Sequence, residues 1–127
     1  MQTKTILLIN SEPNVQESIQ DSFNHFCGWQ VLKASSPHKG LQFATQAEPD
    51  AILFDISTTG MDLFAFLTQL RSQSITQHIP VMIMAEAKWL HADLLQEFAI
   101  AGVIDYSTAF TKFPQQIAQF LNWDKNQ

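Results

Sequence analysis

Cysteine is almost absent from the chain, since Cys27 is the single cysteine among 127 residues. One cysteine cannot form an internal disulfide, and no second cysteine or closely spaced histidine joins it to make a metal site. We therefore predict a reducing, cytoplasmic setting, in which Cys27 is a small, half-buried apolar side chain.

Long apolar runs are missing as well. None approaches the roughly eighteen residues that a membrane-spanning helix needs. No basic segment precedes Ile6–Ile9, the first apolar run, as it would in a signal peptide. These absences predict a protein that makes no contact with a membrane.

Basic residues are few, because seven lysines and arginines stand against twelve aspartates and glutamates, for a formal net charge of −5. No cluster of lysine and arginine could neutralise several phosphates, so direct binding of nucleic acid is not expected. The histidines are scattered without carboxylates at ligand spacing, and we predict surface residues rather than metal ligands. They are His25, His38, His78 and His91.

Apolar sequence is abundant, at 46% of the residues, and it is arranged in short runs. Each run is too short for a helix and predicts a buried strand. The predicted strands are Thr5–Ile9, Gln30–Ala34, Ala51–Phe54, Val81–Met84 and Val103–Tyr106. Segments with helical apolar spacing alternate with them. This alternation predicts an α/β fold, namely a flavodoxin-like doubly wound (βα)5 three-layer sandwich with a five-stranded parallel sheet in the order 2-1-3-4-5.

Proline and glycine mark the expected ends of helices. Pro13 and Pro114 stand where the first turn of a helix tolerates a residue without an N–H group. Gly102 is expected to follow the fourth helix as its C′ residue.

The functional crevice of such a fold lies beyond the carboxyl ends of the strands, where the strand order reverses. The residues that follow the predicted strands there include Asn10–Glu12, Asp55–Gly60, Ala85 and Glu86, and Ser107–Phe110. Among them Asp55 is the one aspartate, which makes it the first candidate for a functional side chain.

The segment from Pro49 to Asp62 resembles the phosphoacceptor stretch of response-regulator receiver domains, which commonly reads PDLILLD followed after three or four residues by PGMDG. Further matches are Ile6–Ile9 with Glu12 and Pro13, Ile79–Val81, and Gly102–Tyr106. The resemblance covers essentially the whole chain. It implies a single receiver-like domain over residues 1–127, without an output domain, in two-component phosphorelay signalling.

Asp55 matches the phosphoacceptor of that family. The resemblance also implies an acidic pair that holds Mg²⁺ directly after the first strand, but the matching residues are Asn10 and Ser11. The threonine or serine expected after the fourth strand is replaced by Ala85, or by Met84 if the alignment slips by one.

The lysine and proline expected after the fifth strand are also replaced, by Ala109 and Phe110. The bond before Phe110 should be trans, because a cis bond before a residue other than proline costs roughly 3 kcal/mol. Tyr106 matches the aromatic switch position of the family. Trp89 and Phe110 lie on the helix 4–strand 5–helix 5 face, with which receivers commonly meet partners, so they are either interface anchors or core residues.

The loss of the acidic pair bears on metal binding. At an effective dielectric near 20, a unit charge about 4 Å away contributes roughly 4 kcal/mol per unit charge on the ion, so two lost carboxylates should abolish useful Mg²⁺ affinity. We expect no cofactor and no catalytic residue. Asp55 is then either a structural acid, satisfied by neutral donors such as Asn10, Ser11, Thr58 or Thr108, or a residual phosphoacceptor.

The sequence therefore predicts a pseudo-receiver that is not an enzyme and that acts through contacts with proteins, such as a histidine kinase or an output protein. A homodimer through the helix 4–strand 5–helix 5 face is one option. The alternative is a working phosphorelay regulator that accepts a phosphoryl group on Asp55 from a histidine kinase. A flavin or nucleotide site is a third hypothesis, which the absence of a glycine-rich loop after the first strand disfavours.

Overall fold

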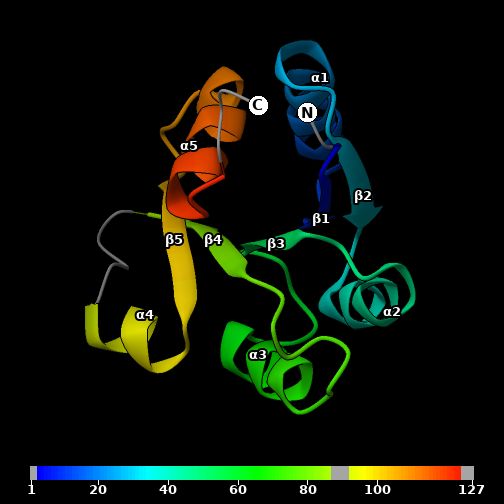
Figure 1. Ribbon diagram of the computed structural model, residues 1–127, viewed down its shortest axis with the longest axis vertical. Coiled ribbons are helices and arrows are strands. Elements are labelled where there is room, and N and C mark those ends of the chain that lie inside the picture. The colour runs from blue at the N-terminus through cyan, green and yellow to red at the C-terminus, as the bar shows by residue number, and fades with distance from the viewer. Residues whose placement is uncertain (1–2, 87–91, 124–127) are drawn as a thin grey trace.

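The computed structural model describes residues 3–86 and 92–123 and contains a five-stranded parallel sheet (Figure 1). The strands are β1 (Thr5–Ile9), β2 (Gln30–Ala34), β3 (Ala51–Asp55), β4 (Val81–Ala85) and β5 (Ile100–Asp105). Their order is β2-β1-β3-β4-β5, which confirms the predicted topology and the doubly wound α/β class. Because β3 and β4 extend slightly beyond their predicted ends, Asp55 and Ala85 are the last residues of these strands.

Helices cover both faces of the sheet. They are α1 (Pro13–Phe26), α2 (Pro37–Ala47), α3 (Leu63–Arg71), α4 (Ala92–Glu97) and α5 (Phe113–Phe120), with a short 3-10 helix, η2 (Phe110–Lys112), before α5. Figure 1 shows α1 and α5 on one side of the sheet and α2, α3 and α4 on the other. Pro13 and Pro114 lie in the first turns of α1 and α5, as predicted.

The core is divided by the sheet into two clusters. In β1, Leu7 and Ile9 pack toward α2 and α3, whereas Ile6 and Leu8 pack toward α1 and α5. Each fully buried leucine or isoleucine contributes roughly 1.5–3 kcal/mol relative to an exposed one. Since both faces are covered, the central strands are continuous apolar runs rather than alternating ones.

The expected role of Gly102 is wrong. Gly102 lies inside β5, which begins at Ile100 rather than Val103, and the left-handed residue after α4 is Ala99, with φ 55°. The register shifts between the pairs Val81–Ile100 and Met82–Gly102, so β5 is irregular there. A side chain at position 102 would collide with the ring of Phe120, which accounts for a glycine within this strand.

An aromatic contact fastens the C-terminal end of the described chain to the body of the domain. The Trp123 ring meets Trp29 edge to face, with centroids 5.1 Å apart, and Lys4 Nζ lies 4.8 Å from the centre of the Trp123 ring. The contact places residues near both ends of the chain side by side.

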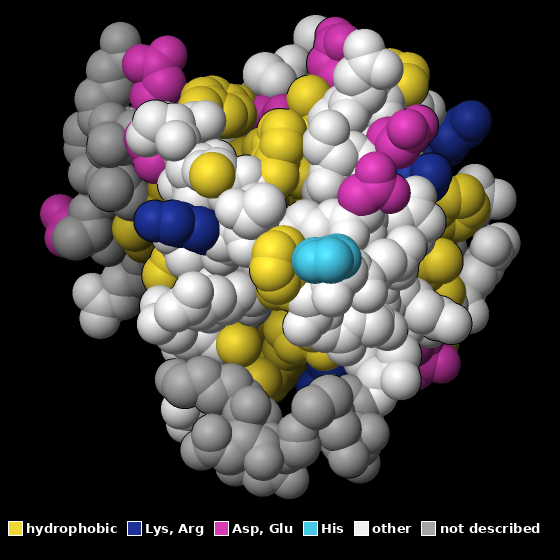
Figure 2. All heavy atoms as spheres, turned by 90° about the horizontal axis from the view of Figure 1, so that it is seen from above, with side chains coloured by type: hydrophobic (Ala, Val, Ile, Leu, Met, Phe, Trp, Pro, Cys, Tyr) yellow, Lys and Arg dark blue, Asp and Glu magenta, His cyan; other side chains and the backbone are white. Residues whose placement is uncertain are grey.

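The surface carries scattered apolar groups. Figure 2 shows the face formed by α1 and α5, where hydrophobic side chains emerge as separate patches among polar and charged ones. His25, His38 and His78 are exposed, as predicted, and His91 lies outside the described residues. None of the described helices has the length and apolar character needed to traverse a bilayer.

Candidate functional site

The carboxyl ends of β1, β3, β4 and β5 bring the predicted site residues to one edge of the sheet. Asn10 directly follows β1, Asp55 ends β3, Ala85 ends β4 and Tyr106 directly follows β5. In the sheet, Asp55 pairs with Met84. These positions lie at the point where the strand order reverses, which is where the fold was predicted to carry its site.

Asp55 is buried, at 5% exposure, and both of its carboxylate oxygens accept hydrogen bonds. Oδ2 accepts from Asn10 Nδ2 at 2.6 Å. Oδ1 accepts from the Ser57 N–H at 2.9 Å, the Ser57 hydroxyl at 2.8 Å and the Tyr106 hydroxyl at 2.6 Å. Hydrogen bonds to a charged group contribute roughly 1.5–3 kcal/mol each, so uncharged donors can hold a buried carboxylate here without a metal or a lysine.

Asn10 is fixed in one orientation. Its side-chain oxygen accepts the Glu12 N–H at 2.6 Å, so its amide nitrogen is the group that faces Asp55. The Gln16 side-chain amide donates to the backbone carbonyl of Asn10. Residue Asn10 as a whole is only 1% exposed. Asn10 therefore offers Asp55 a donor, and its side-chain oxygen is turned toward the start of α1.

The remaining donors differ from those expected. The Thr58 hydroxyl donates to the carbonyl of Ile9 at 3.5 Å, Thr108 donates its N–H to the carbonyl of Asp105, and Ser11 is exposed. Ser57 and Tyr106 bind the carboxylate instead. The bond from the Ser57 N–H was detectable in the sequence, because an aspartate side chain in a turn commonly accepts the backbone N–H two residues further on.

Tyr106 is a candidate site residue whose position the sequence predicted, although its contact with Asp55 was not predicted. Its N–H donates to the carbonyl of Ala85 at 3.0 Å, and its hydroxyl reaches Asp55 while the side chain stays 40% exposed. The pKa of Tyr106 is raised from 10.0 to about 12, because of partial burial in the first place and of the hydrogen bond to Asp55 in the second. Because the folded state holds this proton more tightly than the unfolded chain, the associated stability is present below pH 10 and is lost as the pH rises through about 12.

The fourth strand offers no donor to the pocket. Ala85 is fully buried and pairs with Asp105 of β5, and Met84 is buried in the cluster beneath α1 and α5. Nevertheless the pocket is satisfied, because none of the buried side-chain nitrogens and oxygens in residues 3–86 and 92–123 lacks a hydrogen-bond partner.

Comparison with known proteins agrees with this geometry. A family model for the response regulator receiver domain matches residues 6–108. The chain belongs to that family. This receiver domain is 29% identical over 103 residues to the DNA-binding dual master transcriptional regulator RpaA of Synechocystis sp. and 33% identical over 79 residues to Protein PilH of Pseudomonas aeruginosa. These matches cover 81% and 62% of this chain but only 42% and 64% of the two relatives.

The fold of the receiver domain is also similar to solved structures. The chemotaxis response regulator CheY4 of Vibrio cholerae superposes with a TM-score of 0.83 at 16% identity, over 94% of this chain and 99% of that one. Receiver domains are signalling domains of two-component systems, and they bind Mg²⁺ at the active site.

The side chains around Asp55 do not match the ligands that Mg²⁺ prefers, which are carboxylates and other hard oxygens in octahedral geometry. Both oxygens of Asp55 accept hydrogen bonds, and the side-chain oxygen of Asn10 faces Glu12. Within the described ranges no group of three or more histidine, cysteine, aspartate and glutamate side chains could hold a metal. Asp55 therefore lies in a cage of neutral donors, which are Asn10, Ser57 and Tyr106.

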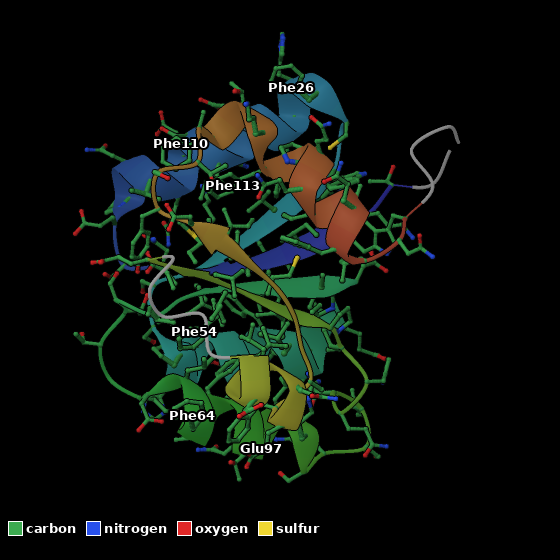
Figure 3. All side chains as sticks on the ribbon, turned by 90° about the vertical axis from the view of Figure 1, so that its left-hand side faces the viewer. Phe26, Phe54, Phe64, Glu97, Phe110 and Phe113 are labelled. Carbon is green, nitrogen blue, oxygen red and sulfur yellow. The ribbon has the colours of Figure 1, made fainter. Side chains whose placement is uncertain are left out.

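The loop after β5 carries Ala109 and Phe110 where the family pattern has lysine and proline. The Ala109–Phe110 bond is trans, as predicted, and Phe110 opens η2. The buried Ser22 hydroxyl of α1 donates to the Phe110 carbonyl at 2.7 Å. The Phe110 ring packs against buried Phe113, with centroids 5.5 Å apart, and Figure 3 shows both on the α1 and α5 side of the sheet.

The predicted interface candidates differ in how exposed they are. Phe110 is half-buried and packs on the core cluster beneath α1 and α5. Tyr106 is the more exposed ring at this edge, and Trp89 lies outside the described residues.

Cys27 is half-buried, and its burial raises the pKa of the thiol, so the side chain has little thiolate character.

Proposed function

We propose that this receiver domain transmits or organises a signal through contacts with other proteins, without Mg²⁺-dependent phosphorylation of Asp55 and without enzymatic activity of its own. The observation that carries the proposal is the set of uncharged donors on both oxygens of Asp55. A phosphoryl group added to this carboxylate has to displace donors that are already well placed. Asn10 and Ser11 supply no carboxylate to hold Mg²⁺, and Ala109 supplies no lysine, so the charge of the added group would not be offset at these positions.

The second candidate is a phosphorelay regulator that accepts a phosphoryl group on Asp55 from a histidine kinase. It is favoured by the position of Asp55, at the carboxyl end of β3 in the crevice where this fold places its functional groups. The two candidates differ in whether the carboxylate is an acceptor or a structural acid.

One experiment separates them. The protein is incubated with acetyl phosphate and Mg²⁺, and its intact mass is followed alongside that of Asp55→Asn. We expect no added phosphoryl mass in either protein, because the transferred charge has no cation to stabilise it. Stoichiometric labelling of the wild type within minutes, absent from Asp55→Asn, would overturn the proposal in favour of the phosphorelay regulator.

Partners are proposed to be proteins, either a histidine kinase or an output protein. They would meet the face built from α4, β5 and α5, which carries Tyr106 at its edge. The same face is proposed as the contact of a homodimer, for which a mass by light scattering is the direct measurement.

A further inference from the structure

The retained acid of this pocket is hydrogen-bonded to the only tyrosine of the chain. We infer that the Tyr106–Asp55 hydrogen bond is an internal latch: it holds the tyrosine ring over the pocket and keeps the segment from Tyr106 to Lys112 in one arrangement without any phosphoryl group. This inference rests on the proposed function, since it assigns Asp55 the role of a positioning residue for that segment rather than of an acceptor.

The hydrogen bond between Tyr106 and Asp55 spans the carboxyl end of β4. Asp55 ends β3 and Tyr106 directly follows β5. These two strands lie on either side of β4 and are therefore separated by roughly twice the 4.8 Å strand spacing. The tyrosine hydroxyl has to cross the end of β4 to reach the carboxylate. Ala85 ends that strand, and its carbonyl accepts the Tyr106 N–H at 3.0 Å, which holds the tyrosine backbone beside β4.

The segment that carries Tyr106 is tied down beyond the latch. The Asp105 carboxylate accepts both the N–H and the hydroxyl of Ser107, and the Asp105 carbonyl accepts the Thr108 N–H at 2.9 Å. Further along, the Phe110 carbonyl accepts the hydroxyl of Ser22, which is buried in α1. Movement of the Tyr106 ring is therefore coupled to a segment that has few ways to rearrange.

The latch and an added phosphoryl group compete for the same atoms. Oδ1 of Asp55 already accepts three hydrogen bonds and Oδ2 accepts one, all from neutral groups. The carboxylate that is the signal input elsewhere in the family is used here as the anchor of an exposed aromatic ring. A partner that docks beside Tyr106 then meets a surface whose shape is set by Asp55.

A single tyrosine makes the latch directly measurable. Because the chain holds one tyrosine, tyrosinate absorbance and the ring carbon signal in NMR report on Tyr106 alone. We expect Asp55→Asn to ionise Tyr106 at a lower pH than the wild type, since the variant keeps the size of the side chain and removes the charge that disfavours tyrosinate. The matched control is Asp21→Asn on the exposed side of α1, which should titrate as the wild type does. Equal midpoints in the wild type and Asp55→Asn would overturn the latch.

A second variant tests whether the latch also orders the segment after Tyr106. In Tyr106→Phe the ring stays and the hydroxyl is lost, and we expect amide hydrogen exchange in residues 107–111 to become roughly tenfold faster, the size of effect given by one hydrogen bond to a charged group. Exchange in β2 should not change. Unaltered exchange at residues 107–111 would contradict the latch.

The two proposals fail in different ways. Phosphoryl labelling of Asp55 combined with an anchored Tyr106 would overturn the proposed function and would confine the latch to the unlabelled protein. An unlabelled Asp55 combined with a freely titrating Tyr106 would overturn the latch and leave the proposed function standing.

Discussion

Single residues decide what the pocket can do. The sequence predicted the places of Asp55 and Asn10 but not the contact made by Tyr106. Asp55 and Asn10 were identified because each follows a strand whose position is fixed by apolar sequence. Asn10 was also expected to donate to Asp55, and it does so at 2.6 Å. The Tyr106 contact was not predicted, because the direction of a side chain that crosses the end of β4 depends on the packed neighbours and not on spacing along the chain.

Restoring an acid at position 10 tests the neutral cage. In Asn10→Asp the donor 2.6 Å from Asp55 becomes a second carboxylate, so two like charges face each other in a buried site. We expect the free energy of unfolding at neutral pH to fall by about 1–3 kcal/mol, measured by urea denaturation.

The pH dependence of Asn10→Asp gives the sign of the effect. Repulsion raises a carboxyl pKa in the folded state above its unfolded value, so the folded state binds more protons and the variant should regain stability as the pH is lowered. Asn24→Asp, at an exposed position of α1, is the control and should show no such recovery. A variant as stable as the wild type at neutral pH would show that the cage tolerates a second charge.

At the scale of elements, apolar runs predicted β1 and β2 correctly and misplaced the start of β5. The error arose at Gly102, which looked like the residue after a helix but lies in the strand beneath Phe120. A glycine that follows a helix and a glycine inside a strand cannot be distinguished from the sequence alone. Only the register shift opposite Val81 and Met82 and the neighbouring ring distinguish them.

Helix α2 meets β1 at a close approach that can be tested. A methyl group at Gly40 would collide with the side chain of Ile9. Gly40→Ala gains up to about 1 kcal/mol in helix propensity, but overpacking of a core contact costs roughly 1–3 kcal/mol, so we expect a net loss of stability in thermal unfolding.

A double variant supplies the control for that contact. Ile9→Val removes the terminal methyl nearest to the new side chain and should cost roughly 0.5–1.5 kcal/mol alone. Combined with Gly40→Ala it should cost less than the sum of the two single variants, because the collision is partly relieved. Strictly additive losses would indicate that α2 shifts away from β1 instead.

The molecule as a whole was the most predictable level. A strict alternation of strands and helices admits few topologies, because crossovers are right-handed and both faces of a parallel sheet must be covered. The sheet order β2-β1-β3-β4-β5 follows from that pattern together with the family resemblance. The edge at which Asn10, Asp55 and Tyr106 meet follows from the order, whereas the bonds that they make there do not.

Binding of Mg²⁺ by the intact protein tests most directly whether neutral donors have replaced the metal at Asp55. A calorimetric titration with magnesium chloride, repeated with Asp55→Asn, is the measurement. We predict no saturable uptake at millimolar magnesium by either protein, because the described residues hold no group of three or more histidine, cysteine, aspartate and glutamate side chains that could bind a metal, and both oxygens of Asp55 already accept hydrogen bonds. Saturable binding by the wild type that disappears in Asp55→Asn would contradict the account.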